Sequence, residues 1–486
     1  MPEPDPDLEG PEIPDNEEVV DPAFARNPKL FLLFRVFFNA RFYYPVYALM
    51  FLDFGLSQEQ FATLNLAWAL SIVLLEVPSG ALADQVGRLP LIIAASLLMI
   101  LEMVVMLLMP VAFDAPAETR EAAISLLFIV FLINRVISGA AEAAASGADE
   151  ALAYDSLAPS RRDELWSQLT SKLMRWQSIG FILVTLIGAA IYDPAFVNRA
   201  LGWVGIESDL SQSLTLKFPI ALTLGMAIGV LIIALQMREP PSGLEQEGRS
   251  LGEALADSFR RTLSAGRWIM MTPAALMLLL IGLFFDSIIR LFYTVGSIWL
   301  EVIGYEPAQL GLISVAGSAA GILAAMLGEH LIRRFGPGFN FRFLSILVFI
   351  GVLSLAFPIQ YWSVMFLPTL WIGMRLLHYF LSNYLNRVTN AENRATVLSF
   401  RGLSMNLSYG LLTWLYGKQT YYLREGRELD GSEDPDVVTH EIFAEAVSTW
   451  WIYFAVVLVG LVAFRLLVIR KGWNELLPSP DSRETG

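Results

Sequence analysis

The chain has 486 residues, of which 55% are hydrophobic and only 16% are charged, and its mean hydropathy is +0.54. Because a soluble domain carries about 25% charged residues, this composition excludes a soluble globular protein and is typical of a membrane protein. Cysteine is absent, which excludes disulfides and thiolate metal sites. The net charge of −14 comes mainly from residues 1–28, with nine acids against Arg26, and from residues 419–441, with seven acids against two arginines.

Apolar runs of roughly 20 residues, the length that crosses the hydrocarbon core of a bilayer, recur along the chain. In lipid each backbone polar group must be satisfied within its own segment, so these runs are predicted to be helices. Twelve are predicted, at about 30–54, 58–83, 89–112, 122–148, 168–192, 212–236, 270–300, 308–332, 341–358, 361–386, 394–417 and 443–470. The fold class expected is therefore an all-α membrane protein.

The longest connection divides the twelve helices into two groups of six. Within it, apolar residues recur every four positions with charges on the other faces, which predicts an amphipathic helix on the membrane surface. These apolar residues are Leu251, Leu255, Phe259 and Leu263. The organisation expected is a disordered acidic tail (1–28), an N-terminal six-helix bundle (29–236), a linker (237–269), a C-terminal six-helix bundle (270–472) and a C-terminal tail (473–486).

The Lys and Arg residues between the predicted helices indicate their orientation, because such residues collect on the cytoplasmic side of a membrane. With both termini inside, seventeen of them fall in cytoplasmic segments and five on the opposite side. The sequence therefore predicts an even number of spans with both termini in the cytoplasm.

Two polar motifs interrupt the apolar pattern of the first half. The turn after the second predicted helix reads Gly-Ala-Leu-Ala-Asp-Gln-Val-Gly-Arg, from Gly80 to Arg88, and the fourth helix contains Arg-Val-Ile-Ser-Gly from Arg135. Asp155 follows Arg135 by twenty residues. Together these resemble the G-x-L-A-D-R-x-G-R and R-x-x-Q-G signatures of the major facilitator superfamily, with Gln and Ser replacing one residue of each. The resemblance covers nearly the whole chain when the six-plus-six division is included.

The resemblance implies two six-helix bundles built from inverted three-helix repeats, and transport by alternating access. It also implies a cytoplasmic latch formed by the residues of the turn. Gly80 would allow a neighbouring helix to pack closely, and Gly87 would permit the sharp turn. Asp84 would face the N-terminal end of the eleventh helix, whose dipole favours an anion, and Arg88 would pair with Asp155. Both contacts would tie the two bundles together when the cavity faces outward.

Charged residues inside the predicted spans are expensive to insert and mark pathways or partners. They concentrate in the first helix of each three-helix repeat, which is the helix that lines the central cavity in such folds. In the third helices only Glu102 lies before the last turn, and the sequence assigns it no partner. The candidate substrate and cavity residues are Arg41, Arg135, Glu142, Asp286, Arg290, Arg375 and His378.

The spacing of these residues predicts individual roles. Asp286 and Arg290 are four apart on one helix, close enough to pair, which would keep the Asp286 carboxylate ionised. Glu142 lies seven residues from Arg135, on the same face but two turns away. We therefore expect Glu142 to carry the coupling proton, with Arg135 assisting it. Four central arginines against two central acids favour a solute with an anionic group.

The function expected is a secondary active transporter that moves a small organic solute, coupled to protons and with export favoured. A phosphate-binding loop of the form G-x-x-x-x-G-K-[ST] is absent, so a gradient rather than ATP is the expected energy source. Residues 184–189 read Val-Thr-Leu-Ile-Gly-Ala, where proton-antiporting exporters of the family usually show G-P-x-x-G-G, and this argues against a multidrug antiporter. The alternatives are a flippase-like transporter of an amphipathic or lipid-linked anion, and a membrane receptor or scaffold without transport.

The partners expected are a small-molecule substrate, protons and the lipid bilayer of the bacterial inner membrane. We expect a monomer that is not an enzyme and that uses no nucleic acid, metal or cofactor.

Overall fold

The computed structural model describes residues 24–240, 250–389, 394–427 and 435–477, and these ranges contain helices and connections without any strand. The side chains of residues 84, 322, 395, 435, 436 and 474 are outside this description. The predicted acidic tail therefore lies almost wholly outside the described residues.

Both halves of the chain are helical along their length. The first half contains α1 (Asn27–Phe38), η1 (Tyr44–Val46), α2 (Tyr47–Asp53), α3 (Gln58–Val86), α4 (Arg88–Leu108), η2 (Ala112–Asp114), α5 (Ala117–Ala145), α6 (Ala148–Asp155), η3 (Pro159–Arg161), α7 (Arg162–Tyr192), α8 (Pro194–Trp203), α9 (Gln212–Thr215) and α10 (Lys217–Ala234). The linker forms α11 (Leu251–Met271). The second half contains α12 (Pro273–Val302), α13 (Pro307–Arg334), α14 (Pro337–Ser354), η4 (Ser363–Phe366), α15 (Leu367–Val388), α16 (Arg394–Glu425), α17 (Pro435–Ser448), α18 (Trp450–Phe464), the π-helical turn η6 (Arg465–Ile469) and α19 (Trp473–Leu476).

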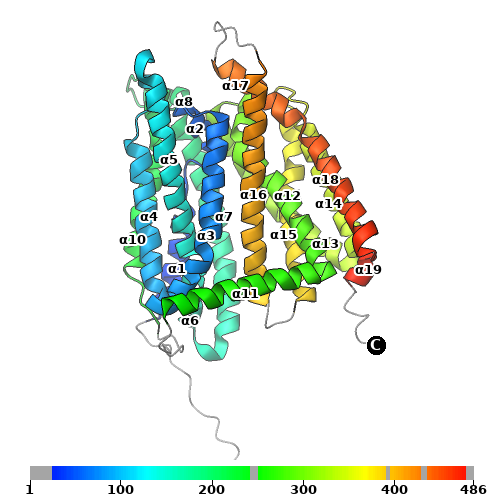
Figure 1. The fold of residues 1–486 in the computed structure, drawn as a ribbon. Helices are drawn as coiled ribbons and strands as arrows, with labels where there is room; N and C mark the ends of the chain where they lie inside the picture. The colour runs from blue at the N-terminus through cyan, green and yellow to red at the C-terminus, as the bar shows by residue number, and fades with distance from the viewer. Residues whose placement is uncertain (1–23, 241–249, 390–393, 428–434, 478–486) are drawn as a thin grey trace, which may run out of the picture.

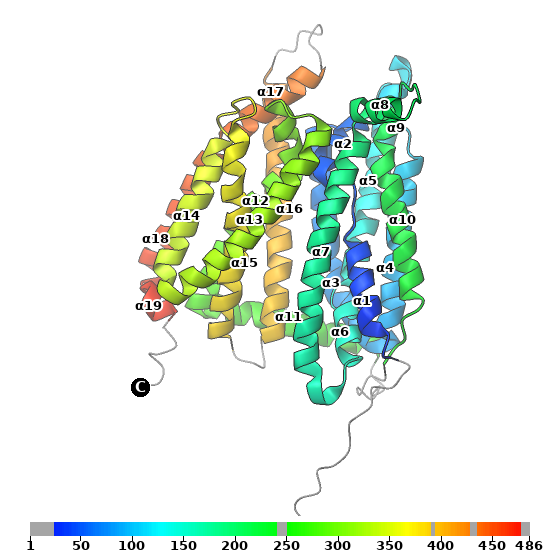
Figure 2. The same ribbon diagram turned by 180° about the vertical axis from the view of Figure 1, so that it is seen from behind.

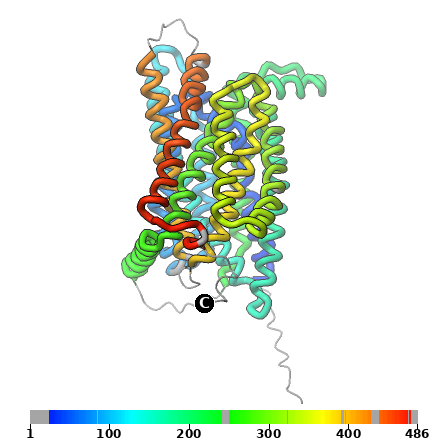
Figure 3. Tube along the Cα trace, turned by 90° about the vertical axis from the view of Figure 1, so that its right-hand side faces the viewer, coloured from blue at the N-terminus to red at the C-terminus, as the bar shows by residue number. Residues whose placement is uncertain are grey.

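The helices form two groups that stand side by side (Figure 1). One group holds α1 to α10 and the other holds α12 to α19, while α11 crosses beneath both. We call the end of the molecule that carries α11 the lower end, and the end that carries α17 the upper end. In the side view of Figure 3, α11 lies at the lower edge and α8 projects at the upper edge on the opposite side.

Ten helices in the described residues are long and apolar enough to cross a membrane. The predicted first and eleventh spans are not among them. The first is divided into α1, η1 and α2, none of which is long enough, and α16 has sufficient length but is more polar than the others. The all-α membrane fold is confirmed, while the number twelve stays a prediction.

Contacts with two other helices fix the non-helical break in the first span. The backbone N–H of Phe42 donates to the Thr223 hydroxyl on α10 at 3.1 Å. On the other side, the Phe42 carbonyl lies so close to α7 that a Cβ on Gly188 would sit 1.8 Å from its oxygen. Only glycine fits there, because the closest atom is backbone and does not rotate away. The break places Arg41 in an irregular segment in the middle of the bundle.

Local contacts fix both ends of α3 and the start of α4. Ser57 and Gln60 form a capping box at the start of α3. Gly87, with φ of 94°, ends α3 in a conformation that favours glycine. The Glu239 carboxylate then accepts hydrogen bonds from the backbone N–H groups of Arg88 and Leu89, at 3.0 and 2.6 Å. An anion at this helix N-terminus is favoured by the helix dipole.

The linker helix α11 has three faces. One face, which includes Ala265 and Ile269, is buried against α3, α12 and α16. A second carries the exposed apolar residues Phe259 and Leu263, and a third carries the charged residues, such as Arg260. This arrangement agrees with the predicted amphipathic helix and adds a protein-facing side. It fits a helix that lies against the protein at the level of the membrane surface.

The close approach at the helix break predicts an asymmetric response to two glycine substitutions. Gly188→Ala should destabilise the protein by about 1–3 kcal/mol or more, because the new Cβ overlaps a backbone carbonyl. Gly225 on α10 has no atom within 4 Å of an added Cβ, so Gly225→Ala is the matched control and should change stability by less than about 1 kcal/mol. Thermal unfolding in detergent measures both. Equal melting temperatures for the two variants would contradict the proposed contact.

Candidate functional site

A buried ion cluster occupies the middle of the N-terminal bundle. The Glu102 carboxylate on α4 is fully buried and accepts from Arg41 at 2.9 Å through one oxygen and from Arg135 at 2.5 Å through the other. Both arginines are also buried. One acid thus pairs with two cations, which leaves the cluster with a formal charge of +1.

Polar groups on neighbouring elements complete this cluster. Arg135 donates to the Tyr47 hydroxyl at 2.9 Å, and Arg41 lies 3.3 Å from the Tyr43 hydroxyl. The Asn134 side chain donates to the Glu102 backbone carbonyl at 2.8 Å. Hydrogen bonds to charged groups are the stronger kind, so they offset part of the cost of burying three charges.

The structure supplies the partner that the sequence analysis leaves open. Glu102, to which the sequence assigns no partner, is the centre of the cluster. Arg135, which is expected to assist Glu142 from two turns away, pairs with Glu102. The missed signal was a balance of charge: two mid-span arginines, Arg41 and Arg135, have no acid within one helical turn, and Glu102 of the same bundle has no base within one turn.

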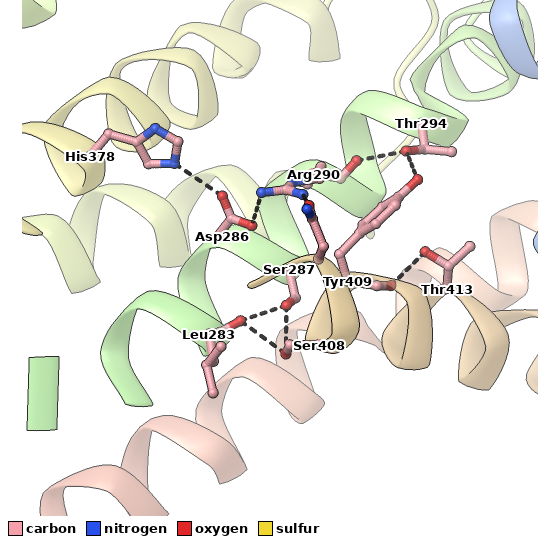
Figure 4. A network of polar contacts seen from close by, with 10 residues as sticks. Leu283, Asp286, Ser287, Arg290, Thr294, His378, Ser408, Tyr409 and Thr413 are labelled. Atoms are coloured by element: carbon pink, nitrogen blue, oxygen red, sulfur yellow. Dashed lines mark hydrogen bonds and ion pairs between the residues drawn. The ribbon is translucent and has the colours of Figure 1, made fainter. Parts of the chain in front are cut away.

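A second cluster lies in the C-terminal bundle (Figure 4). Asp286 on α12 is fully buried, and Arg290, one turn away, pairs with it at 2.5 Å as predicted. His378 on α15 contacts the other Asp286 oxygen at 3.0 Å, and its side chain is 54% exposed. Arg290 also donates to Asn406 at 2.8 Å and lies over the ring of Tyr409. Asp286 is therefore held from two sides.

Two of the predicted cavity residues, Glu142 and Arg375, and one further acid, Glu76, have no ion pair within the described chain. Glu142 is half-buried, and Glu76 on α3 lies close enough to interact with it electrostatically. Arg375 on α15 is exposed. Neither acid nor Arg375 has a salt bridge to any residue that the structure describes. The pairing of Arg41, Arg135 and Arg290 with acids removes most of the cationic excess that favoured an anionic solute.

The motif turn brings together most of the predicted latch residues. Arg88 and Asp155 form the predicted ion pair, and Arg162 lies 3.9 Å from the same carboxylate. Both Arg88 and Asp155 belong to the N-terminal half, on α4 and α6, so this pair does not join the two bundles and that part of the prediction is wrong. Gly80 has no described atom within 4 Å of an added Cβ, so the close packing predicted for it is not present. The Asp84 side chain lies outside the described residues.

The two bundles meet in the upper half of the molecule. A Cβ on Gly417 or Gly410 of α16 would lie 2.6 or 2.8 Å from an alanine Cβ of α3. On the other side, α13 approaches α7 so closely that a Cβ on Gly311 would lie 2.8 Å from a backbone carbonyl. Figure 2 shows α7 and α13 close together at their upper ends and diverging toward the lower end. Small residues thus form both contact lines.

Polar contacts reinforce this upper closure. The Tyr416 hydroxyl donates to Gln58 at 2.9 Å, and Arg424 lies 3.4 Å from Glu59. The backbone N–H of Ala308 lies 3.3 Å from the Asp193 carboxylate. Each pair joins the N-terminal half to the C-terminal half near the upper ends of the helices.

Comparison with known proteins identifies the class. The family model described as Major Facilitator Superfamily matches residues 30–413. The chain therefore belongs to the major facilitator superfamily, and it is a secondary transporter rather than an enzyme. No curated protein matches the chain significantly.

Solved structures show the same fold at low sequence identity. A bacterial homologue of the human lysosomal transporter Spinster, in an inward-facing and unoccupied conformation, has a TM-score of 0.66 and 17% identity, over 95% of this chain and 99% of that chain. The nucleoside transporter NupG has a TM-score of 0.62 and 11% identity, over 91% and 99%. A D-xylose-proton symporter has a TM-score of 0.57 and 14% identity, over 89% and 96%.

The Glu102 cluster predicts a large effect on stability. Glu102→Ala leaves Arg41 and Arg135 buried without their shared counter-ion, and breaking a buried ion pair in this way costs about 3–5 kcal/mol. We expect a strongly lowered melting temperature or loss of the folded protein in detergent. Glu118→Ala, which removes an exposed acid from the first turn of α5, is the control and should change stability by about 0.5 kcal/mol or less. Wild-type melting of the Glu102 variant would contradict the assigned role of this carboxylate.

Proposed function

We propose that the protein is a proton-coupled exporter of a small organic solute that works by alternating access in the bacterial inner membrane. The observation that carries the proposal is the contrast between paired and unpaired charge in the middle of the spans. Glu102 and Asp286 are each held by cationic partners, whereas Glu142 has no ion pair in the described chain. An unpaired acid at this depth needs water, a solute or a proton.

Alternating access is supported by where the two bundles touch. The close contacts between α3 and α16, and between α7 and α13, lie in the upper half. If the lower end is cytoplasmic, as the distribution of Lys and Arg favours, the structure corresponds to a state open toward the cytoplasm. The similarity to an inward-facing structure supports the same assignment. In the opposite state the lower ends would close, and the turn from Gly80 to Arg88 would meet the N-terminal end of α16.

Glu142 is the proposed proton carrier. Its carboxylate can hold a proton or a cationic group of a solute, but not both at once. Competition at one carboxylate couples the two movements in opposite directions, and with an inward proton gradient this produces export. Asp286 is the second candidate, although its two oxygens already contact Arg290 and His378.

Alternating access can be tested before any substrate is known. Because the chain contains no cysteine, pairs of spin labels can be introduced without background. Glu207→Cys with Tyr422→Cys reports the distance between bundles at the upper end, and Ser160→Cys with Arg333→Cys reports it at the lower end. We expect electron–electron double resonance at acidic and neutral pH to show two populations, in which one distance lengthens as the other shortens.

The control for these distances lies within one bundle. Glu207→Cys with Glu118→Cys places both labels at the upper end of the N-terminal half, and this distance should stay constant. Single, unchanged distances for all three pairs would favour a receptor or scaffold over a transporter.

The carrier role predicts a specific loss. In proteoliposomes, Glu142→Gln should keep exchange of a solute down its own gradient and lose accumulation driven by a pH gradient, because glutamine cannot release a proton. The solute is found by a thermal-shift screen of metabolites and drugs on the purified protein. Glu150→Gln, an exposed acid near the lower end, serves as the control and should accumulate solute like the wild type. Accumulation that persists in Glu142→Gln would move the assignment to Asp286 or to another ion.

A further inference from the structure

Two carboxylates form the acidic part of the N-terminal wall between the bundles. Ala62, Ala69 and Glu76 are seven residues apart on α3 and so share one face of the helix. The first two pack against glycines of α16, so this face points at the C-terminal bundle. Glu76 continues the face downward, past the contact line, and remains half-buried with Glu142 as its electrostatic neighbour.

An aromatic ring accompanies these acids. Tyr44, at the start of η1, lies near Glu142 and is 46% exposed although it lies in the middle of the first span. Carboxylates beside an exposed ring provide the two kinds of group that attract an organic ammonium, through charge and through the ring face.

The wall of the C-terminal bundle has the opposite character. Arg375 is exposed and lies near Tyr293 of α12. It also lies beside Gly321 of α13, where an added Cβ would be 3.5 Å from its Nε. His378, one turn further along α15, exposes its side chain beside Asp286. Arg375 is thus a cation that forms no ion pair with any carboxylate of the described chain.

The two walls lie at similar depth. Counted along their helices at 1.5 Å per residue, Glu76 is roughly 15 Å above the lower end of α3, and Arg375 is roughly 20 Å above the lower end of α15. The acids of one bundle and the cation of the other therefore belong to the same level of the space between the bundles.

We infer that the transported solute is a zwitterion, with its ammonium group bound by Glu76, Glu142 and Tyr44 and its anionic group bound by Arg375. This inference rests on the proposed transport function and names the class of substrate. When the lower ends close, both walls lose water, and a charge that is buried without a partner is strongly disfavoured. A zwitterion supplies a partner to each wall, whereas a simple cation leaves Arg375 unpaired and a simple anion leaves the two carboxylates unpaired.

Matched probes test the requirement for two charges. The probes are ω-amino acids with two to six methylene groups between the ammonium and the carboxylate, together with the alkylamine and the carboxylate of equal length. Binding is measured by titration calorimetry on the full chain in lipid nanodiscs. We expect at least one zwitterion to bind about tenfold tighter than both of its singly charged counterparts, a difference of about 1.4 kcal/mol.

Two variants assign the charges to their walls. Glu76→Gln should weaken binding of the best zwitterion about tenfold and leave the matched carboxylate unchanged, since only the ammonium loses a partner. Arg375→Gln should weaken the same zwitterion and leave the matched amine unchanged. The unaffected probe shows that each variant is folded. Glu118→Gln and Arg342→Gln, which remove exposed charges away from this level, should leave all affinities unchanged.

Three outcomes would overturn the inference. These are equal affinity for zwitterions and singly charged probes, no binding by any zwitterion of the series, and equal weakening of all probes by both variants. Each of them leaves the proposed function standing, because the spin-label distances are measured without any of these probes.

Discussion

The constraint on which the rest of the structure depends is the cost of an unpaired charge inside a bilayer. Glu102 meets this constraint for two arginines at once, in a fully buried position between α4, α5 and the break in the first span. Asp286 does the same for Arg290 on the opposite side of the molecule. Once these pairs are removed from consideration, Glu76, Glu142 and Arg375 stand out as charges that the described part of each bundle does not satisfy by itself.

The main buried ion pairs lie within single bundles, and each bundle also carries charges that it leaves unpaired. Both partners of each buried ion pair belong to the same bundle, so each bundle can move as a unit without breaking its pairs. The contacts between bundles are of another kind: small residues pack along two lines, and a few hydrogen bonds and one partly exposed ion pair join the upper ends. Separating these contacts costs little free energy, because it leaves no buried charge without a partner.

Much of the fold could be predicted from the sequence, because few backbone structures are stable in lipid. Apolar length and the polar turn from Gly80 to Arg88 gave the helical membrane fold and the family, and a spacing of four gave the pair of Asp286 with Arg290. The partner of Glu102 could not be found in this way, because it depends on three segments that meet only after folding. The same limit applied to Arg88 and Asp155: their pairing was predicted correctly, but spacing along the chain does not tell whether a pair lies within a bundle or between two. The periodicity of a sequence describes single helices, whereas the partner of Glu102 and the position of the Arg88–Asp155 pair depend on how helices pack against one another.

The linker helix α11 has a consequence that extends beyond the protein itself. It packs against α3 of one bundle and against α12 and α16 of the other, while Phe259 and Leu263 remain exposed on its apolar face. If this apolar face enters the bilayer surface, as the sequence predicts, a helix that is tied to both bundles must shift within that surface whenever the bundles rock. The work of displacing headgroups would then become part of the conformational equilibrium, and the lateral pressure and lipid composition of the host membrane would help to set the working rate of the protein.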